Sequence, residues 1–153
     1  MIALGSNLGD RRAAVAFALE RLTPIVSDLV VSEIIETEPE GEGVRGQPPY
    51  LNAVVVGRTS LPARELLARL LHIEREFGRT RPAPLAARTL DLDLILLGDL
   101  VIEEPGLHVP HPRFRDRFFV LGPLAGIAPH LRDPVTGQQV WQLLQSLLRD
   151  ETR

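Results

Sequence analysis

The pattern of hydrophobic positions predicts alternating strands and helices along most of the chain. Short β-branched or alternating runs at residues 1–4, 28–36, 50–58 and 88–98 are typical of strands, whose side chains repeat with a period of two. Apolar residues recur at three- and four-residue spacing from Gly9 to Leu22 and from Pro62 to Phe77, as on one face of a helix. The predicted order of elements is therefore β-α-β-β-α-β.

This order is typical of a ferredoxin-like α+β fold, in which helices pack on one face of an antiparallel sheet. Ser60 and Pro62 mark the start of the second helix, and Gly78 is predicted to follow its last residue. Residues 99–153 are expected to add loops and a last helix near 138–149. The apolar face of that helix would consist of Val140, Leu144, Leu147 and Leu148. We expect one domain, residues 1–153.

The strand with the most unusual pattern is "LDLDLIL" at residues 90–96. Period two turns its leucines toward the helices and places Asp91 and Asp93 together on the opposite face. Aspartate is a poor strand former and two like charges repel, so a cation between the carboxylates would remove that cost. The pair is either part of a solvated acidic face or a site for one or two Mg²⁺ ions, which prefer oxygen ligands and often keep phosphate oxygens.

Arginines surround this acidic pair. All 17 basic residues are arginine, which excludes a Schiff-base lysine and a Walker-type lysine. Six of the 17 lie between residues 79 and 117: Arg79, Arg81, Arg88, Arg113, Arg115 and Arg117. They form either a surface salt-bridge network or the cationic part of a Mg-nucleotide site, where positive charge follows the charge that develops on phosphates.

Composition limits the partners of the chain. The absence of cysteine excludes disulfides, thiolate metal sites and a cysteine nucleophile. A formal net charge of −3 argues against nucleic-acid binding. No apolar run approaches the roughly 20 residues of a membrane span, and the first residues lack the pattern of a signal peptide. We expect a cytoplasmic enzyme that acts on small molecules, without a membrane or nucleic-acid partner.

Several polar and aromatic residues stand out for their positions. Asn52 lies inside an apolar strand, where it is either a satisfied buried amide or a group that binds the edge of a flat heterocycle. Tyr50 shares its face, and Phe119 could supply a second ring, although core packing is the alternative for both. Asn7 fits a turn or helix cap. His111 stands out among the histidines because arginines surround it.

Six segments together resemble one known family. They are "ALGSNLGD", "ETEP", "QPPYLNAVV", "RTLDLDLILLG", "VPHPR" and "DRFFVLGPL", and they follow one another across nearly the whole chain. In this order they are similar to the 6-hydroxymethyl-7,8-dihydropterin pyrophosphokinases of folate biosynthesis. The resemblance implies a ferredoxin-like fold and the transfer of pyrophosphate from ATP to the hydroxymethyl group of the pterin, which gives AMP.

The resemblance also implies roles for individual residues. Asp91 and Asp93 would hold two Mg²⁺ ions against the phosphates of ATP, and Arg79 and Arg88 would contact the phosphates during transfer. Further nucleotide contacts would come from Glu74, Arg81, Leu94, His111 and Arg117. The pterin would be bound by Asn7, Thr37, Tyr50, Asn52 and Phe119. The loop between Arg79 and Arg88 would close over ATP.

Two other functions agree with the same pattern. One is a different Mg-nucleotide-dependent transferase of ferredoxin-like fold, such as a palm-like nucleotidyltransferase. The other is a non-catalytic nucleotide-binding module, a use to which such folds are often put. The chain is expected to be a monomer, with a weak homodimer as the alternative.

Overall fold

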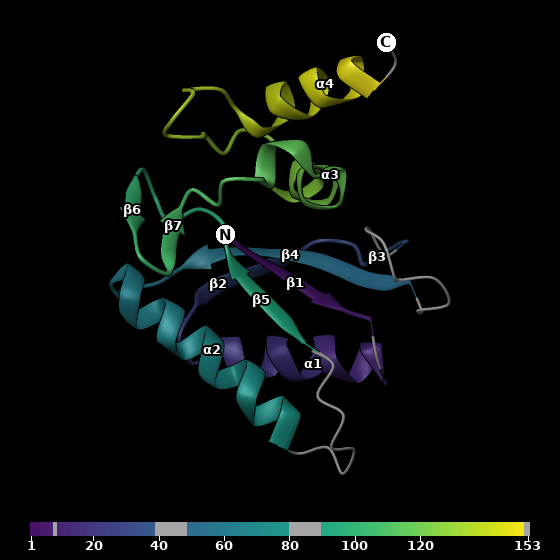
Figure 1. The fold of residues 1–153 in the computed structure, drawn as a ribbon, viewed down its shortest axis with the longest axis vertical. Helices are drawn as coiled ribbons and strands as arrows, with labels where there is room; N and C mark the ends of the chain where they lie inside the picture. The colour runs from purple at the N-terminus through teal and green to yellow at the C-terminus, as the bar shows by residue number, and fades with distance from the viewer. Residues whose placement is uncertain (8, 39–48, 80–89, 152–153) are drawn as a thin grey trace.

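The structure is a computed structural model that describes residues 1–7, 9–38, 49–79 and 90–151 (Figure 1). The first part of the chain contains β1 (Ile2–Ser6), α1 (Arg11–Leu22), β2 (Ser27–Val31), β3 (Ile35–Thr37), β4 (Tyr50–Arg58), α2 (Ala63–Arg79) and β5 (Asp91–Leu94). The rest contains β6 (Ile102–Glu104), β7 (Leu107–Val109), the 3₁₀ helix η1 (Phe114–Asp116), α3 (Phe118–Ile127) and α4 (Val140–Glu151). The mixed α and β composition that the sequence predicts is confirmed.

The main sheet is antiparallel and has the order β2-β4-β1-β5, with β3 also paired to β4. The nine residues of β4 therefore lie between β1 on one side and both β2 and β3 on the other. β5, which carries the two aspartates, forms one edge of the described sheet. In the register of β1 and β5, Ala3 lies opposite Asp93 and Gly5 lies opposite Asp91.

The prediction of one strand over residues 28–36 is wrong, because this segment forms two strands, β2 and β3. Ser32 lies between them and is 6% exposed. Its backbone N–H donates to the Val54 carbonyl (2.9 Å), and its hydroxyl accepts from the Val54 N–H (2.9 Å). The side chain thus replaces a ladder hydrogen bond where the pairing breaks, and β3 places Thr37 opposite Tyr50.

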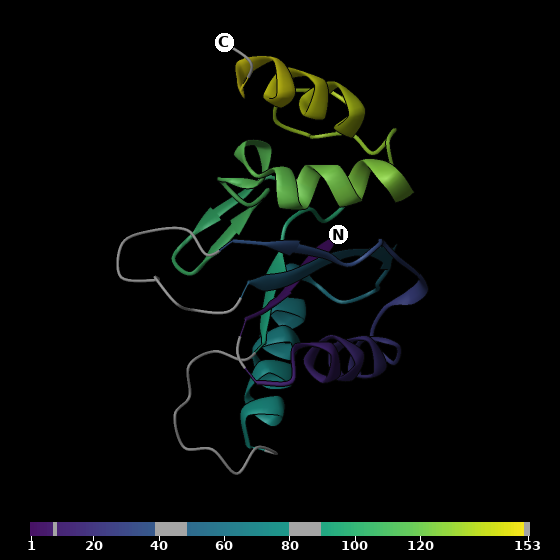
Figure 2. The same cartoon turned by 90° about the vertical axis from the view of Figure 1, so that its right-hand side faces the viewer.

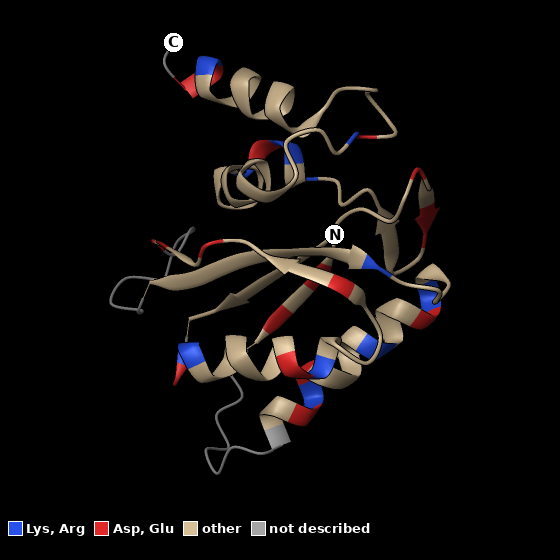
Figure 3. Cartoon of the chain, turned by 180° about the vertical axis from the view of Figure 1, so that it is seen from behind, with Lys and Arg blue, Asp and Glu red and all other residues tan. Residues whose placement is uncertain are grey.

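Helices α1 and α2 pack against one face of the sheet (Figures 1 and 2). Asp10 caps α1 by accepting a hydrogen bond from the Ala13 N–H (3.0 Å). The core on this face includes Leu4, Val55, Leu92, Leu94, Ala14, Ala18, Leu66 and Leu70. Both predicted helices are confirmed, but α2 continues through Gly78 to Arg79, so Gly78 does not follow the helix end. Acidic and basic residues intermingle along α2, whereas in α1 they stand near the two ends of the helix (Figure 3).

The two helices of the predicted pattern lie on one face of the sheet as expected, but a further helix that the sequence analysis did not predict covers part of the other face. Helix α3 packs on the other face, and α4 packs on α3 from outside (Figure 1). This second core includes Val54, Ile95, Leu96, Phe114, Val120, Leu121, Leu124 and Val140. The sheet is therefore enclosed between α1 and α2 on one side and α3 on part of the other.

The C-terminal third also differs from the expected loops. Strands β6 and β7 form a hairpin, which Arg64 of α2 holds through hydrogen bonds to the Glu104 carboxylate (3.1 Å) and the Pro105 carbonyl (3.2 Å). The last helix is confirmed, but Leu148 is 42% exposed and does not belong to its inner face. None of the helices in the described ranges combines the length and the apolar composition needed to cross a membrane.

Candidate active site

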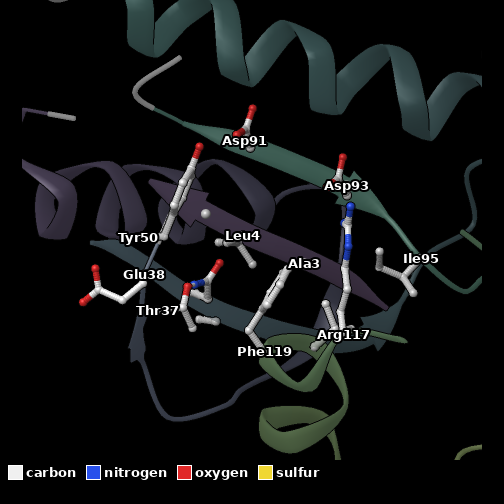
Figure 4. A pocket seen from close by; sticks show the side chains of 14 residues that line it. Ala3, Leu4, Thr37, Glu38, Tyr50, Asp91, Asp93, Ile95, Arg117 and Phe119 are labelled. Carbon is white, nitrogen blue, oxygen red and sulfur yellow. Dashed lines mark hydrogen bonds between the residues drawn. The ribbon is translucent and has the colours of Figure 1, made fainter. Parts of the chain in front are cut away.

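A cavity of about 290 Å³ lies on the α3 side of the sheet (Figure 4). Its walls come from β1, β4, β5, the end of β3 and the start of α3. They consist of Ala3, Leu4, Gly5, Thr37, Glu38, Tyr50, Asn52, Ala53, Asp91, Asp93, Ile95, Arg117, Phe119 and Val120. The acidic pair and the residues expected to bind a flat ring, which are far apart in the sequence, thus meet in one cavity.

Asp91 and Asp93 project from β5 to the same side of the strand (Figure 4). Leu92, between them, turns to the opposite face and is 3% exposed. Their cross-strand neighbours on β1, Gly5 and Ala3, are the two smallest residue types. Because these small side chains leave space above β1, a ligand that lies over β1 can reach both carboxylates.

Glu74 approaches the same strand from its outer edge. The Glu74 carboxylate accepts a hydrogen bond from the backbone N–H of Leu92 at 2.7 Å. Leu92 is the residue between the two aspartates, and its N–H points away from β1. Glu74, for which the family resemblance implies a place near the nucleotide, therefore holds the strand that carries the acids.

The cavity also contains a polar side chain, Asn52, together with two aromatic residues, Tyr50 and Phe119. The Asn52 side-chain amide donates a hydrogen bond to the Thr37 hydroxyl at 2.6 Å. An asparagine amide has a second N–H and a carbonyl oxygen, which here line the cavity. Tyr50 and Phe119 enter the cavity from β4 and α3. This arrangement suits a flat heterocycle with hydrogen-bonding groups along its edge.

Gly5 is a cavity residue that the sequence reasoning missed. A Cβ atom at this position would lie 3.4 Å from the Asn52 Oδ1 and 3.9 Å from the Tyr50 ring. A glycine inside a strand often marks a place where another group approaches closely, and this signal was available in the sequence. Ala3, two residues earlier on the same face, leaves similar space.

Arg117 stands at the start of α3 and reaches across the cavity toward Asp93 (Figure 4). Its guanidinium carbon lies 5.5 Å from the centre of the Phe119 ring. The Arg117 Nε is buried and makes no hydrogen bond to any described part of the chain. Arg117 lines the cavity, so an anionic ligand near Asp93 would lie beside its positive charge.

His111 lies just outside this wall, and its protonation can be inferred from its contacts. Its backbone N–H donates to the Ile95 carbonyl (2.9 Å), and its Nδ1 accepts from the Arg113 N–H (3.1 Å). The neutral ring therefore carries its proton on Nε2. Burial lowers the His111 pKa; Asp93 raises it, while Arg117 and Arg113 lower it again, and the net pKa lies below 6.5. His111 is a neutral hydrogen-bond donor at neutral pH.

The remaining predicted residues lie elsewhere. Asn7 is buried (4% exposed) two residues beyond Gly5 and is not part of the described cavity wall. The Leu94 side chain lies in the core between the sheet and the helices, away from the cavity. The Arg79 side chain, Arg81 and Arg88 lie outside the described residues, so their predicted phosphate contacts stay predictions.

Comparison with known proteins gives a consistent family. Residues 1–129 match the family model described as 7,8-dihydro-6-hydroxymethylpterin-pyrophosphokinase (HPPK). A relative from Synechocystis sp. is 39% identical over 153 residues, which cover 96% of this chain and 75% of the relative. One from Bacillus subtilis is 42% identical over 150 residues, which cover 92% and 89%. Both bear the name 2-amino-4-hydroxy-6-hydroxymethyldihydropteridine pyrophosphokinase.

Solved structures support the fold. The wild-type HPPK-DHPS chain of Plasmodium falciparum with SDX-DHP has a TM-score of 0.76 at 14% identity and covers 99% of this chain. This chain spans 44% of the length of that one. Pyrophosphokinases are the class of protein to which the matches point. The chain belongs to the 7,8-dihydro-6-hydroxymethylpterin-pyrophosphokinase (HPPK) family.

Proposed function

We propose that the chain transfers pyrophosphate from ATP to the hydroxymethyl oxygen of 6-hydroxymethyl-7,8-dihydropterin and releases AMP, a step of folate biosynthesis. One observation carries this proposal. In a member of the HPPK family, a single cavity combines two carboxylates on β5 with a hydrogen-bonding amide and two aromatic rings. The first group suits metal-bound phosphates, and the second suits a pterin.

The pterin would lie at the Asn52 end of the cavity. The Asn52 amide and the Thr37 hydroxyl would pair with nitrogen and oxygen atoms on the edge of the ring. Tyr50 and Phe119 would pack against the ring, because aromatic contacts favour flat partners. This placement directs the hydroxymethyl group toward the acidic strand β5.

The donor set fits magnesium. Asp91 and Asp93 supply two carboxylates to the cavity, and no group of three or more His, Asp or Glu side chains that could hold a metal ion is found among the described residues. Mg²⁺ usually takes only one or two protein carboxylates and completes its shell with water and phosphate oxygens. The two aspartates would hold two Mg²⁺ ions with ATP. When bound, the ions neutralise charge on the phosphates and favour displacement at phosphorus.

In the proposed reaction the hydroxymethyl oxygen attacks the β-phosphorus of ATP. The bond from that phosphorus to the oxygen bridging to the α-phosphorus breaks, and AMP leaves with that oxygen. Arg117 would stabilise negative charge beside Asp93, and the Nε2–H of His111 would donate to the nucleotide. Arg79 and Arg88 are proposed to stabilise the transition state. The hydroxyl proton would pass either to the Asp93 carboxylate or to water, and a bound metal would favour its loss by lowering the pKa of the hydroxyl.

We also infer a ferredoxin-like arrangement, supported by the strand order β2-β4-β1-β5 with α1 and α2 on one face. In this proposal β3, α3 and α4 are additions to that arrangement. The enzyme would act as a cytoplasmic monomer on small molecules, without a nucleic-acid partner. A chain without cysteine is consistent with a reducing compartment.

The direct test is to incubate the protein with ATP, Mg²⁺ and 6-hydroxymethyl-7,8-dihydropterin and to measure AMP and the pterin diphosphate. We expect both products in equal amounts, and no more than background when the metal is chelated. No AMP above the metal-free control would overturn the proposal. ATP binding without AMP would favour a non-catalytic module, and release of pyrophosphate would favour nucleotidyl transfer.

A further inference from the structure

Asp133 is a buried charge that the proposed reaction does not use. It lies in the loop between α3 and α4 and is 0% exposed. Its carboxylate accepts four hydrogen bonds, from the Arg115 Nε (2.6 Å), the Arg115 Nη2 (2.9 Å), the Val135 N–H (3.0 Å) and the Thr136 hydroxyl (2.8 Å). A carboxylate with so many donors occupies one fixed orientation.

Arg115 belongs to η1, so this contact joins two segments that are 18 residues apart in the sequence. Its guanidinium carbon also lies 4.7 Å from the centre of the Phe114 ring, which is 0% exposed. A buried ion pair contributes little net stability, because desolvation offsets most of the attraction. What the two parallel hydrogen bonds provide is a defined distance and angle between η1 and the loop.

The turn that Arg115 fixes leads directly into the cavity. The Phe114 N–H donates to the His111 carbonyl (3.4 Å), the Arg117 N–H donates to the Phe114 carbonyl (3.4 Å), and the Val120 N–H donates to the Arg117 carbonyl (3.0 Å). The segment from His111 to the first turn of α3 is thus one hydrogen-bonded unit. The backbone of this unit determines where the Arg117 side chain begins, and no described residue accepts a hydrogen bond from the buried Arg117 Nε.

We propose that Arg115 and Asp133 are positioning residues. Their contact fixes η1 against the loop between α3 and α4 and thereby directs the Arg117 side chain into the cavity. Neither side chain lines the cavity, so both act through Arg117 and not on the substrate. The inference rests on the proposed function of the cavity and of Arg117 in it. In a purely structural role, the pair would only stabilise the loop before α4 and would not affect the position of Arg117.

The first variants separate charge from shape. Asp133→Asn keeps the size of the side chain but removes its charge, and Arg115→Lys keeps the charge but loses the two-pronged geometry. We expect each to lower kcat with ATP about tenfold, while the KM for the pterin changes less than about twofold. The matched control is Arg132→Gln, an exposed arginine in the same loop, which should leave turnover unchanged.

The decisive measurement repeats Asp133→Asn in an Arg117→Ala background. If the pair acts through Arg117, adding Asp133→Asn to Arg117→Ala causes no further loss of kcat. It should still lower the melting temperature by as much as Asp133→Asn lowers that of the parent protein. An equal loss of kcat in both backgrounds, or no loss in a folded Asp133→Asn protein, would overturn the inference. Normal turnover of Arg117→Ala would instead contradict the proposed function of Arg117. Should Asp133→Asn not fold, Arg115→Lys serves in the same cycle.

Discussion

The face of the sheet that packs on α1 and α2 differs from the face that packs on α3, although the same strands build both. On the first face, Leu4, Val55 and Leu92 are all buried in a continuous apolar core. On the second, β4 carries Asn52 into the cavity and, two residues later, Val54 into the core beneath α3. One face of one strand therefore changes from cavity wall to core within a few residues.

This difference shows how the fold separates stability from chemistry. Helix α3 covers only part of its face, and its first residues, Phe118 and Phe119, begin at the rim of the cavity, while Leu121 and Leu124 are completely buried. The same helix thus contributes buried residues to the core and forms one wall of the cavity. On the first face, a second cavity is lined mainly by apolar residues, among them Ile2, Val55 and Leu66 of the core. Changes to the two faces should accordingly affect different measured quantities.

The largest expected effect is on the acids of the second face. Asp91→Ala and Asp93→Ala should each lower turnover by a factor on the order of 10²–10³, because each removes a proposed metal ligand beside the phosphates. The melting temperature should change little. AMP release at saturating Mg²⁺ measures the effect, and Asp99→Ala, an exposed acid just after β5, is the control. Near-normal turnover in either variant would exclude its metal role.

Substitutions in the core of the first face should instead change the free energy of unfolding. Leu70 of α2 is 0% exposed, so Leu70→Ala should reduce the free energy of unfolding by about 2–5 kcal/mol. Leu71 on the same helix is 43% exposed, and Leu71→Ala should change it by less than about 0.5 kcal/mol. Urea titration measures both. If Leu70→Ala reduced kcat of the folded protein without reducing stability, the separation between the faces would be disproved.

A smaller effect is expected at the pterin end of the cavity. Asn52→Ala removes the hydrogen bond to Thr37 and the proposed contacts to the ring edge, so the KM for the pterin should rise about tenfold. The KM for ATP should stay within about twofold. Thr59→Val, just beyond the far end of β4, is the control. Equal changes in both KM values would argue that Asn52 shapes the whole cavity and does not bind the pterin.

The smallest effect concerns pH. Burial alone would raise the pKa of the Asp133 carboxyl, but hydrogen bonds from Arg115, Thr136 and Val135 outweigh burial and hold the pKa below 3.8. A lowered pKa means that the unfolded chain takes up the proton first, so the stabilisation is complete above about pH 5 and decreases as the pH falls through 3.8 and below. The difference in unfolding free energy between the parent protein and Asp133→Asn should therefore narrow in acid. Urea titrations at several pH values measure this difference. A difference that does not change with pH would contradict the lowered pKa of Asp133.

The elements with a clear period were predictable, and the one without a period was not. β5 alternates, β4 is a run rich in β-branched residues, and α1, α2 and α4 carry their buried residues at helical spacing. Helix α3 packs between the sheet and α4, so its sequence is apolar on both sides and has no helical periodicity. Gly122 and Pro123 inside it further suggest a loop. Nothing local could show that α3 folds back onto the face that carries the acids.

The site was predictable where chemistry contradicts the local pattern. Asp91, Asp93 and Asn52 are polar residues in apolar strands, and all three line the cavity. Thr37 came only from the family resemblance, because a threonine at a strand end is unremarkable. Gly5 was missed because its contribution is space and not a functional group. Arg115 does carry a functional group, but its position among the flanking arginines does not indicate that it contacts Asp133.

The hydrogen bond between Glu74 and the Leu92 N–H has a consequence for association between molecules. An edge strand with unpaired N–H groups is a template onto which a strand of another molecule can be added, which leads to aggregation. Among the described residues β5 forms an edge of the sheet; it has four residues and carries both acids. The Glu74 carboxylate occupies the outward donor at its middle and places a negative charge there. The strand that would hold the metal ions is thereby also protected from pairing with a neighbouring molecule.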